Sequence, residues 1–453
     1  MKRIICTFLI FITGFVSLFA AYNSLGIPDS AEIRNNLMER WFEAPLPLVR
    51  NNLPEYLYNE SGQKFKVSME ESEDVFNIYV SPQSFIDVTV VSDKGSRKET
   101  QEFFPVDAPG SFVLVKDKKT GKPLRIRYYF LKNSEVYVQF IPKNKTALAD
   151  FVMFGNYAAR GVSTGIPFDY FYTTSIESVI KLTEKKIPWN YVLVDSNAYY
   201  DIEQMIGVIR EKLPEIKYRF DAMIDEHGKQ VYVSSGAPYE YEAEDDPKKL
   251  YLSSVGFLKW IGDGIVEPIS GGHLKRGPLI APTVEVKETG HQGILSQNYD
   301  LYFSLNWVRN LAAAIFSVYS GSTYLFSESG VDVTTNPFAS AITDRGVENI
   351  VTFIENSGYS VGVLKSLLYV LSATEPNTFY FGAIRGTNKA VTPEVKAFNE
   401  CVAFFPYFLS DGAFECAVFL NGKEISLEQF IMLYEDDFVY LTRVKADRQF
   451  YPQ

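Results

Sequence analysis

The chain has 453 residues, of which 46% are hydrophobic and 22% charged, and its formal net charge is -11 at pH 7. The hydrophobic content is sufficient for buried cores and excludes global disorder, and the length is sufficient for two or three domains of about 100–200 residues each. The acidic balance argues against nucleic acid as a partner, because phosphate recognition needs a basic surface, and 3 cysteines are too few for a disulfide-rich scaffold.

The first twenty residues have the features of a secretory signal peptide. Lys2 and Arg3 precede an uncharged apolar stretch, residues 4–21, and the small residue Ala20 marks the expected cleavage site. We therefore expect residues 1–20 to be removed and the protein to be periplasmic or secreted in a bacterium. The apolar run is also long enough for an uncleaved anchor, which needs about 17 residues or more. Such an anchor is the only membrane attachment that the sequence suggests.

The next part of the chain changes from helical to strand periodicity. Residues 21–60 form a lead-in, with one amphipathic helix expected at 31–43 and a linker rich in proline and asparagine after it. Residues 61–154 contain short runs with alternating apolar and polar positions, separated by turn residues. Several such runs at regular spacing predict an antiparallel β-sandwich domain over 61–154.

Helical periodicity returns after residue 155, mixed with further strands. We expect one α+β domain over residues 155–453, so the predicted fold class is α+β with an N-terminal antiparallel β-sandwich module. The expected helices lie at 175–186, 199–213, 298–320, 347–358 and 360–373. In the segment 250–265 two serines precede a further apolar helix, and a short capped helix from Ser426 and a strand at 438–444 follow later.

Two cysteines remain after the predicted signal peptide, and the local pattern argues against a bond between them. The segments that carry Cys401 and Cys416 flank turn residues near Asp411 and predict a β-hairpin. In that register Cys416 faces about Pro406, and Cys401 faces about Asn421. The two thiols would lie about 16 Å apart along the strands, whereas a disulfide needs Cα atoms within about 7 Å. We predict two free, mostly buried thiols.

The most informative motif lies at residues 251–260. Two serines precede an apolar helix that carries a glycine and an aromatic residue at fixed positions. The pattern resembles the start of the catalytic helix in NlpC/P60-type cell-wall peptidases, in which an acidic residue and the nucleophilic cysteine precede a small residue, a glycine and an apolar residue. Here Ser253 stands at the acidic position and Ser254 at the cysteine position, and Gly256, Phe257 and Trp260 match the remainder. A helix N-terminus favours an anionic nucleophile, and a glycine in the first turn lets a neighbouring backbone approach closely.

The resemblance implies a papain-like fold for residues 155–453 and peptidoglycan or peptide as the ligand. In that family a histidine near the start of a following strand serves as the base, whereas Asn399 to Cys401 occupy that place here and Ser254 replaces the thiol. We therefore expect a degenerate domain in an exported envelope protein, one that binds its ligand rather than cutting it. The alternative is a non-enzymatic structural or interaction protein of the envelope.

An active form would be a hydrolase of peptide or amide bonds. A serine hydroxyl needs an adjacent base near pH 7, and the chain has 3 histidines. His227 lies in a predicted surface turn, so the candidate base for Ser254 is His273 or His291, both in loops flanked by glycine. The structural alternative is that Ser253 and Ser254 form a helix cap, which serine favours.

A second candidate nucleophile is Ser163. Residues 161–165 fit the G-x-S-x-G elbow of serine hydrolases, which requires a strand before the serine and a helix directly after it. The alternative is a glycine-rich connection. We expect no cofactor and no metal, because the chain has no phosphate-binding or dinucleotide motif and no close pair of cysteines. The acidic segment 239–249 is interpreted as a solvated loop rather than a calcium site.

Overall fold

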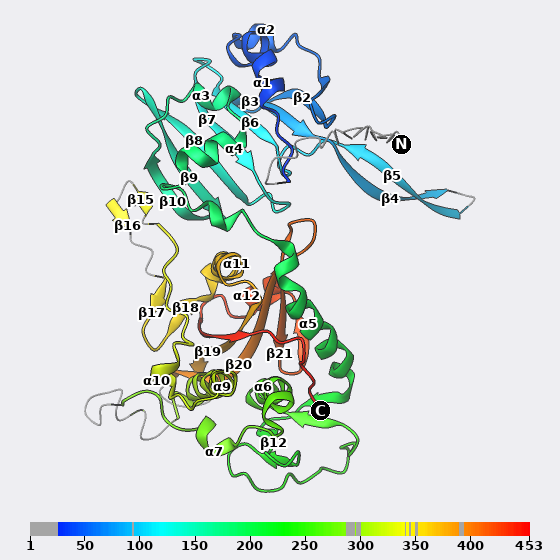
Figure 1. Cartoon of the computed structure of the whole chain (residues 1–453), viewed down its shortest axis with the longest axis vertical. Helices are drawn as coiled ribbons and strands as arrows, with labels where there is room; N and C mark the ends of the chain where they lie inside the picture. Colours follow the sequence, from blue (N-terminus) through cyan, green and yellow to red (C-terminus); the bar gives the residue numbers. More distant parts are fainter. Residues whose placement is uncertain are drawn as a thin grey trace, which may run out of the picture. The chain divides into compact units, whose positions relative to one another are not determined.

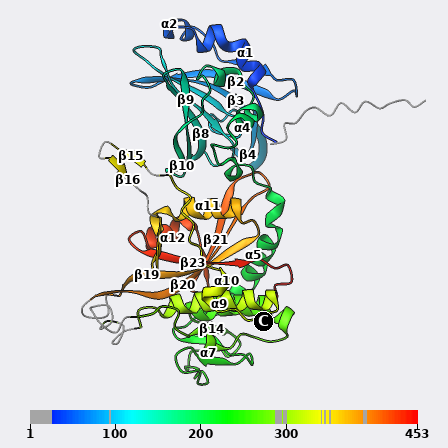
Figure 2. The ribbon, with the colours of Figure 1, turned by 60° about the vertical axis from the view of Figure 1, so that its left-hand side comes forward.

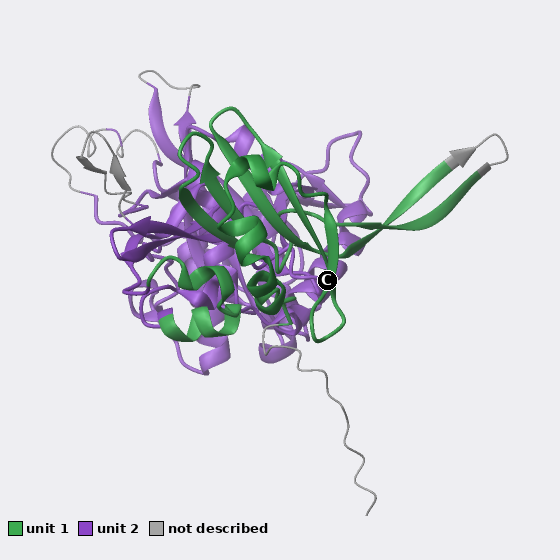
Figure 3. Ribbon diagram, turned by 90° about the horizontal axis from the view of Figure 1, so that it is seen from above, with its two compact units in different colours: residues 1–128, 167–182 green, residues 129–166, 183–453 purple. Residues whose placement is uncertain are grey.

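The chain is described from a computed structural model, which covers residues 26–453 apart from 93–94, 287–294, 296–299, 340, 344–345, 349–351 and 389–393. It divides into two units (Figure 3). Unit 1 comprises Met1–Tyr128 and Pro167–Leu182, and unit 2 comprises Tyr129–Ile166 and Thr183–Gln453. The mixture of helices and largely antiparallel strands confirms the α+β class. The predicted signal peptide, residues 1–20, lies outside the described residues.

Unit 1 contains an antiparallel sheet with a short helical lead-in. Strands β1, β2, β3, β6 and β7 pair in that order, and β4 and β5 pair with each other as a separate hairpin. The antiparallel strands predicted from the sequence are therefore present, and their stacking as a sandwich stays a prediction. The bounds (Figure 1) are α1 Ala31–Leu37, a π-helix Met38–Phe42, α2 Leu46–Val49, β1 Glu55–Tyr58, β2 Lys64–Glu71, β3 Val75–Pro82, β4 Ser84–Ser92, β5 Gly95–Phe103, β6 Phe112–Asp117, β7 Pro123–Tyr129, α3 Tyr170–Thr173 and α4 Ile176–Thr183.

Alternation along the strands builds the core of unit 1. Phe76, Ile78 and Val80 alternate along β3 and are fully buried, as the period of two requires for one face of a sheet. The helical lead-in turns Ile33 and Leu37, four positions apart on α1, into the same interior. The amphipathic helix predicted near 31–43 is thereby confirmed, with its last turn wound as a π-helix.

Arg34 is a buried cation that joins α1 to the segment 167–182 within unit 1. Its side chain is 1% exposed. It donates hydrogen bonds to the Ser30 hydroxyl (3.0 Å), the Tyr128 hydroxyl (3.2 Å) and the carbonyl oxygens of Phe171 (3.1 Å), Tyr172 (2.7 Å) and Thr174 (3.0 Å). The Asp29 carboxylate lies 3.5 Å away and balances the charge. Burial raises the pKa of Tyr128 to about 12, so its hydroxyl stays protonated beside the cation.

Unit 2 begins with a three-stranded meander and continues into a larger α+β arrangement. Its bounds are β8 Val136–Lys143, β9 Thr146–Met153, β10 Asn156–Ser163, α5 Tyr200–Lys212, β11 Ile216–Tyr218, β12 Ala222–Ile224, β13 Gln230–Tyr232, β14 Leu250–Leu252, α6 Ser254–Ser270, α7 Arg276–Leu279, α9 Phe303–Ser320, α10 Phe326–Ser329, β15 Ala341–Thr343, β16 Gly346–Glu348, β17 Phe353–Ile354, β18 Gly358–Ser360, α11 Leu364–Thr374, β19 Thr378–Asn388, β20 Val395–Phe408, β21 Phe414–Leu420, β22 Lys423–Ile425, α12 Leu427–Leu433 and β23 Phe438–Lys445. Short 3₁₀ segments lie at Trp189–Tyr191, Ser196–Tyr199, Leu213–Glu215 and Val361–Val363.

A seven-stranded sheet organises unit 2, in the order β17-β18-β23-β19-β20-β21-β22. On one face α6 packs Phe257 against Phe419. On the same face the Cys401 thiol of β20 donates a weak hydrogen bond to the Ser304 carbonyl of α9. On the other face α12 packs Phe430 against Phe404. Figure 2 shows α11 and α12 on the opposite side of the sheet from α9. The sheet is therefore covered on both faces, and β22 forms one of its edges.

The expected helix at 347–358 is wrong in its described part. Strands β17 and β18 pair there around a turn at Asn356. Gly358 has a φ of +87°, and a Cβ at this position would overlap the carbonyl of Val439 on β23. The spacing of the apolar residues in 347–358 is similar to that of a helix. The backbone at Gly358 instead pairs closely with β23, which leaves no room for a side chain and requires a glycine. The helices expected at 199–213, 298–320 and 360–373 are confirmed in their described residues by α5, α9 and α11.

The predicted hairpin and its cysteines are confirmed. Strands β20 and β21 pair with Pro406 opposite Cys416, and Val402 opposite Leu420 places Cys401 at the level of Asn421. Both cysteines are free, with Cys401 buried and Cys416 partly buried. Burial raises the pKa of the Cys401 thiol to about 12 and that of Cys416 well above its ordinary value.

We expect both thiols to react slowly with iodoacetamide at pH 8 while the protein is folded. The thiolate is the nucleophile, and a pKa near 12 leaves roughly one thiol in ten thousand ionised at this pH. Labelling followed by peptide mapping should give Cys401 a rate at least about a thousandfold below that in guanidinium chloride, where a thiol of ordinary pKa, about 8.5, is about a quarter ionised. The rate of Cys416 should also be lower in the folded protein. Rapid labelling of Cys401, or a peptide that joins Cys401 to Cys416, would contradict the assignment.

Candidate functional site

The two serines of the motif lie at the N-terminus of α6 and have different roles. Ser253 is the N-cap: its hydroxyl accepts the Gly256 amide at 3.2 Å and donates to the carbonyl of Ala222 on β12 at 3.0 Å. The Ser253 amide donates to the same carbonyl at 2.8 Å. Ser254 is the first helical residue and is 7% exposed. The helix-cap interpretation therefore holds for Ser253, and the Ser254 side chain is buried.

His273 lies at the other end of α6 and is wrong as a base for Ser254. Its Nε2 is 3.3 Å from a carboxylate oxygen of Glu267, near the C-terminus of the helix. Glu267 follows Ser254 by 13 residues on α6, or about 20 Å along the helix axis at the α-helical rise. A general base must come within hydrogen-bond reach of its nucleophile. The other candidate base, His291, lies outside the described residues.

His273 instead lines a small cavity beside α6. The cavity has a volume of about 210 Å³ and is lined by Trp260 and Leu250 as well as by His273. The Trp260 indole donates to the carbonyl of Gln453 at 2.8 Å. Trp260 of the motif thus contacts Gln453, whose side chain also donates to Glu267 in the C-terminal part of α6.

Ser163 does not occupy a nucleophile elbow. It is the last residue of β10, pairs with Leu148 of β9 and is exposed. The elbow requires a sharp turn between a strand and a helix. Gly161 instead lies in a bulge within β10. The Gly161 amide donates there to the Asp150 carboxylate at 2.6 Å. The serine-hydrolase hypothesis based on Ser163 is therefore wrong for this geometry.

A long groove lies along the outer edge of β21, within unit 2. Its volume is about 520 Å³. We call it the β21-edge groove, and it is lined by Asn133, Arg210, Lys365, Tyr407, residues 414–417 and residues 424–429. The lining residues come from both faces of the sheet, so the groove wraps around its edge.

The groove exists because β22 is shorter than its neighbour. β22 pairs only with Val418 to Leu420, so residues 414–417 of β21 have no strand on that side among the residues that the structure describes. The Phe414 amide points to this edge and donates to the Asn133 side chain at 2.7 Å. Because strand backbone groups alternate in direction, the amide and carbonyl of Cys416 point to the same edge. The Phe414 amide is engaged by Asn133, so the groove offers the Phe414 carbonyl and the Cys416 amide and carbonyl to a further strand.

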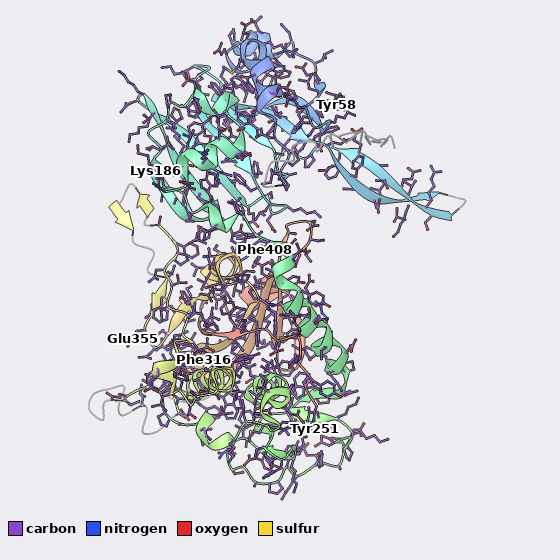
Figure 4. All side chains as sticks on the ribbon, in the orientation of Figure 1. Tyr58, Lys186, Tyr251, Phe316, Glu355 and Phe408 are labelled. Atoms are coloured by element: carbon purple, nitrogen blue, oxygen red, sulfur yellow. The ribbon has the colours of Figure 1, made fainter. Side chains whose placement is uncertain are left out.

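The walls of the groove combine aromatic side chains with paired charges. Phe414 packs against Phe408, labelled in Figure 4, with ring centroids 5.5 Å apart. Arg210 forms two hydrogen bonds with the Glu424 carboxylate, at 2.8 and 2.6 Å. Lys365 lies 3.1 Å from the carboxylate of Glu428, and Glu415 has no ion pair in the described part of the chain. The lining thus holds two cations and three carboxylates, a balance of -1 when all are ionised.

Sequence reasoning identified parts of this groove without joining them. The predicted cap at Ser426 is present as a capping box with Gln429, and it starts α12 directly after β22. The turn at Asn421 and Gly422 was also visible as a turn signal. Only three residues, 423–425, lie between that turn and the Ser426 cap. A strand of this length is too short to pair with the whole of β21, and this is the sequence signal that could have located the groove.

No metal site accompanies these features in the part of the chain that the structure describes. Among the described ranges, no three His, Cys, Asp or Glu side chains gather in a way that could hold a metal ion. In the acidic segment 239–249, Asp245 forms an ion pair with Arg219 and accepts the Glu242 amide at 2.9 Å. The buried Asp245 carboxylate is therefore balanced by residues of the protein itself.

Comparison with known proteins places only part of the chain. No helix in the described ranges has the length and hydropathy needed to span a bilayer. No curated protein and no solved structure matches the chain. Residues 23–191, less than half of the sequence, are similar to a family described as Domain of unknown function (DUF8515).

Proposed function

We propose that the protein is a non-enzymatic binding protein of the bacterial cell envelope that holds an extended peptide in the β21-edge groove. The observation that carries the proposal is the edge of β21 at residues 414–417, which pairs with no strand among the described residues and lines a groove of about 520 Å³. An extended peptide can add to such an edge, with affinity from backbone hydrogen bonds and selectivity from alternate side chains. The peptide class of ligand also agrees with the resemblance to NlpC/P60 peptidases.

The charges of the groove favour a peptide that carries a positive charge. Arg210 and Lys365 are each engaged with a carboxylate of the groove itself. Glu415 is exposed and is the carboxylate left to meet an incoming cation. A lysine side chain of the bound peptide would approach Glu415 without opening either existing pair.

We expect a capped hexapeptide of alternating valine and lysine to bind in a fluorescence anisotropy titration. A twin peptide with N-methylated backbone amides should bind at least about tenfold more weakly, because strand addition needs its N–H donors. Glu415→Lys should weaken binding of the lysine peptide, whereas Glu435→Lys, the same charge change at an exposed position outside the groove, should not. Equal binding of both peptides, or equal effects of both variants, would overturn the site.

The non-enzymatic part of the proposal has a separate test. Purified muropeptides incubated with the full chain should remain uncut, since the Ser254 side chain is buried at a helix start. Turnover that Ser254→Ala abolishes would contradict this part and would restore the active-hydrolase alternative with His291 as the base. Binding of muropeptides without turnover would support the envelope assignment.

A further inference from the structure

The β4–β5 hairpin of unit 1 is a two-stranded arm with a free edge on each side. Each strand has nine residues, and within the described chain the two strands pair only with each other. The arm extends away from the remainder of unit 1 (Figures 1 and 3). A two-stranded ribbon is marginally stable alone in water, so an arm of this length gains stability from a further strand.

The two edges of the arm differ in charge. Among the described side chains of β4, Asp87 is the only charged residue, and its carboxylate accepts the Thr100 hydroxyl at 2.7 Å. β5 instead carries four charged side chains, Arg97, Lys98, Glu99 and Glu102. Charges protect strand edges against pairing with other chains. The edge of β5 is protected in this way, and the edge of β4 is not.

The β4 strand also exposes apolar side chains. Phe85 is 63% exposed and Ile86 is 42% exposed. Ile86, Val88 and Val90 alternate along the strand and therefore share one face of the arm. Val88 and Val90 are half-buried, and Phe85 lies on the opposite face of the arm. Exposed apolar side chains next to a free backbone edge are typical of surfaces that pair with another strand.

We propose that β4 pairs with β4 of a second copy of this chain, antiparallel around a twofold axis. The product is a four-stranded sheet in the order β5-β4-β4-β5, in which both unprotected edges are covered and the charged β5 strands become the new edges. Such an interface is isologous, so β4 must be complementary to itself.

The sequence of β4 meets this requirement in the register that overlaps all nine residues. The centre of the strand is Val88, which would face its own copy. Ile86 then faces Val90, so three apolar side chains from each copy form one continuous row. Asp87 faces Thr89 and no like charge. A register centred on Asp87 would instead oppose two carboxylates at about 5 Å, which is destabilising.

Engineered cysteines test the register. In a Cys6→Ser background, Val88→Cys places two thiols on opposite residues, with Cα atoms about 5 Å apart, within the reach of a disulfide. Val90→Cys is the matched control, because its two copies lie four residues apart along the strand, about 13 Å. Mild oxidation should convert Val88→Cys to a covalent dimer and leave Val90→Cys uncrosslinked. Equal crosslinking of both variants would overturn the proposed register.

Sedimentation equilibrium tests the association itself. The unmodified chain at about 100 μM should contain a species of twice the monomer mass, because at this concentration half of the chains are paired if the Kd is about 100 μM. Val88→Lys places two like charges opposite each other at the twofold axis and should abolish the dimer. Gln101→Lys adds the same charge to β5, on the face of the arm that carries Val88, and should leave the dimer intact. A monomeric unmodified chain, or dimers that survive Val88→Lys, would contradict the proposal.

Discussion

Replacing Gly256 by alanine is expected to destabilise the packing of α6 on β12 by about 3 kcal/mol. A Cβ at this position would overlap the carbonyl oxygen of Ala222 and lie 3.1 Å from both Cα and Cβ of Met223. The obstacle is backbone, which cannot rotate aside as a flexible side chain can. The first turn of α6 would have to move away from β12.

That movement would also break the bonds that fix the start of the helix. The amide and the hydroxyl of Ser253 both donate to the Ala222 carbonyl, at 2.8 and 3.0 Å. Alanine has a higher helix propensity than glycine by about 1 kcal/mol, which offsets part of the loss. The free energy lost through the steric overlap and the broken hydrogen bonds is larger than this gain in helix propensity.

Hydrogen exchange of individual segments is the suitable measurement, because a chain of two units need not unfold in one step. We expect the amides of α6 and β12 to exchange about a hundredfold faster in Gly256→Ala, the equivalent of about 3 kcal/mol. Gly207→Ala on α5 is the control, since a Cβ there meets no atom within 4 Å. It should stabilise α5 by up to about 1 kcal/mol. Changes of the same sign in both variants would contradict the steric argument.

Features set by neighbouring residues could be predicted from the sequence. The cap at Ser253, the close approach at Gly256 and the register that places Cys416 opposite Pro406 all follow from short-range rules for caps, glycine and hairpin turns. These rules depend on a few adjacent residues, so no knowledge of the remaining chain is needed.

Features set by distant elements could not be predicted. The distance from Ser254 to His273 depends on how far α6 continues, and the helix runs through Pro268 to Ser270. The β21-edge groove depends on a difference in length between β21 and β22, together with side chains from α5 and α11. Sequence periodicity identifies each element, whereas the space that remains between elements is determined by their assembly.

Replacing Arg34 by methionine is expected to destabilise unit 1 by about 3–5 kcal/mol, the usual range for breaking a buried charged network. Methionine fills a similar volume but donates no hydrogen bond. The carbonyl oxygens of Tyr172 and Thr174 would lose the guanidinium donor that they accept at 2.7 and 3.0 Å. Asp29 would keep its bonds to the amides of Ala31 and Ile176 but lose its counter-charge.

The position of Arg34 makes the expected effect non-local, and this separates its role from a simple loss of helix stability. Arg34 belongs to α1, yet three of its acceptors lie in residues 171–174, so exchange should accelerate in α3 and at the start of α4 as well as in α1. Arg40→Met is the matched control: Arg40 is half exposed, lies 2.9 Å from Glu55, and should cost at most about 1 kcal/mol. Arg34→Lys keeps the charge but not the planar set of donors, so it should recover only part of the protection. Faster exchange confined to α1, or equal losses in Arg34→Met and Arg40→Met, would show that the guanidinium does not join the two segments.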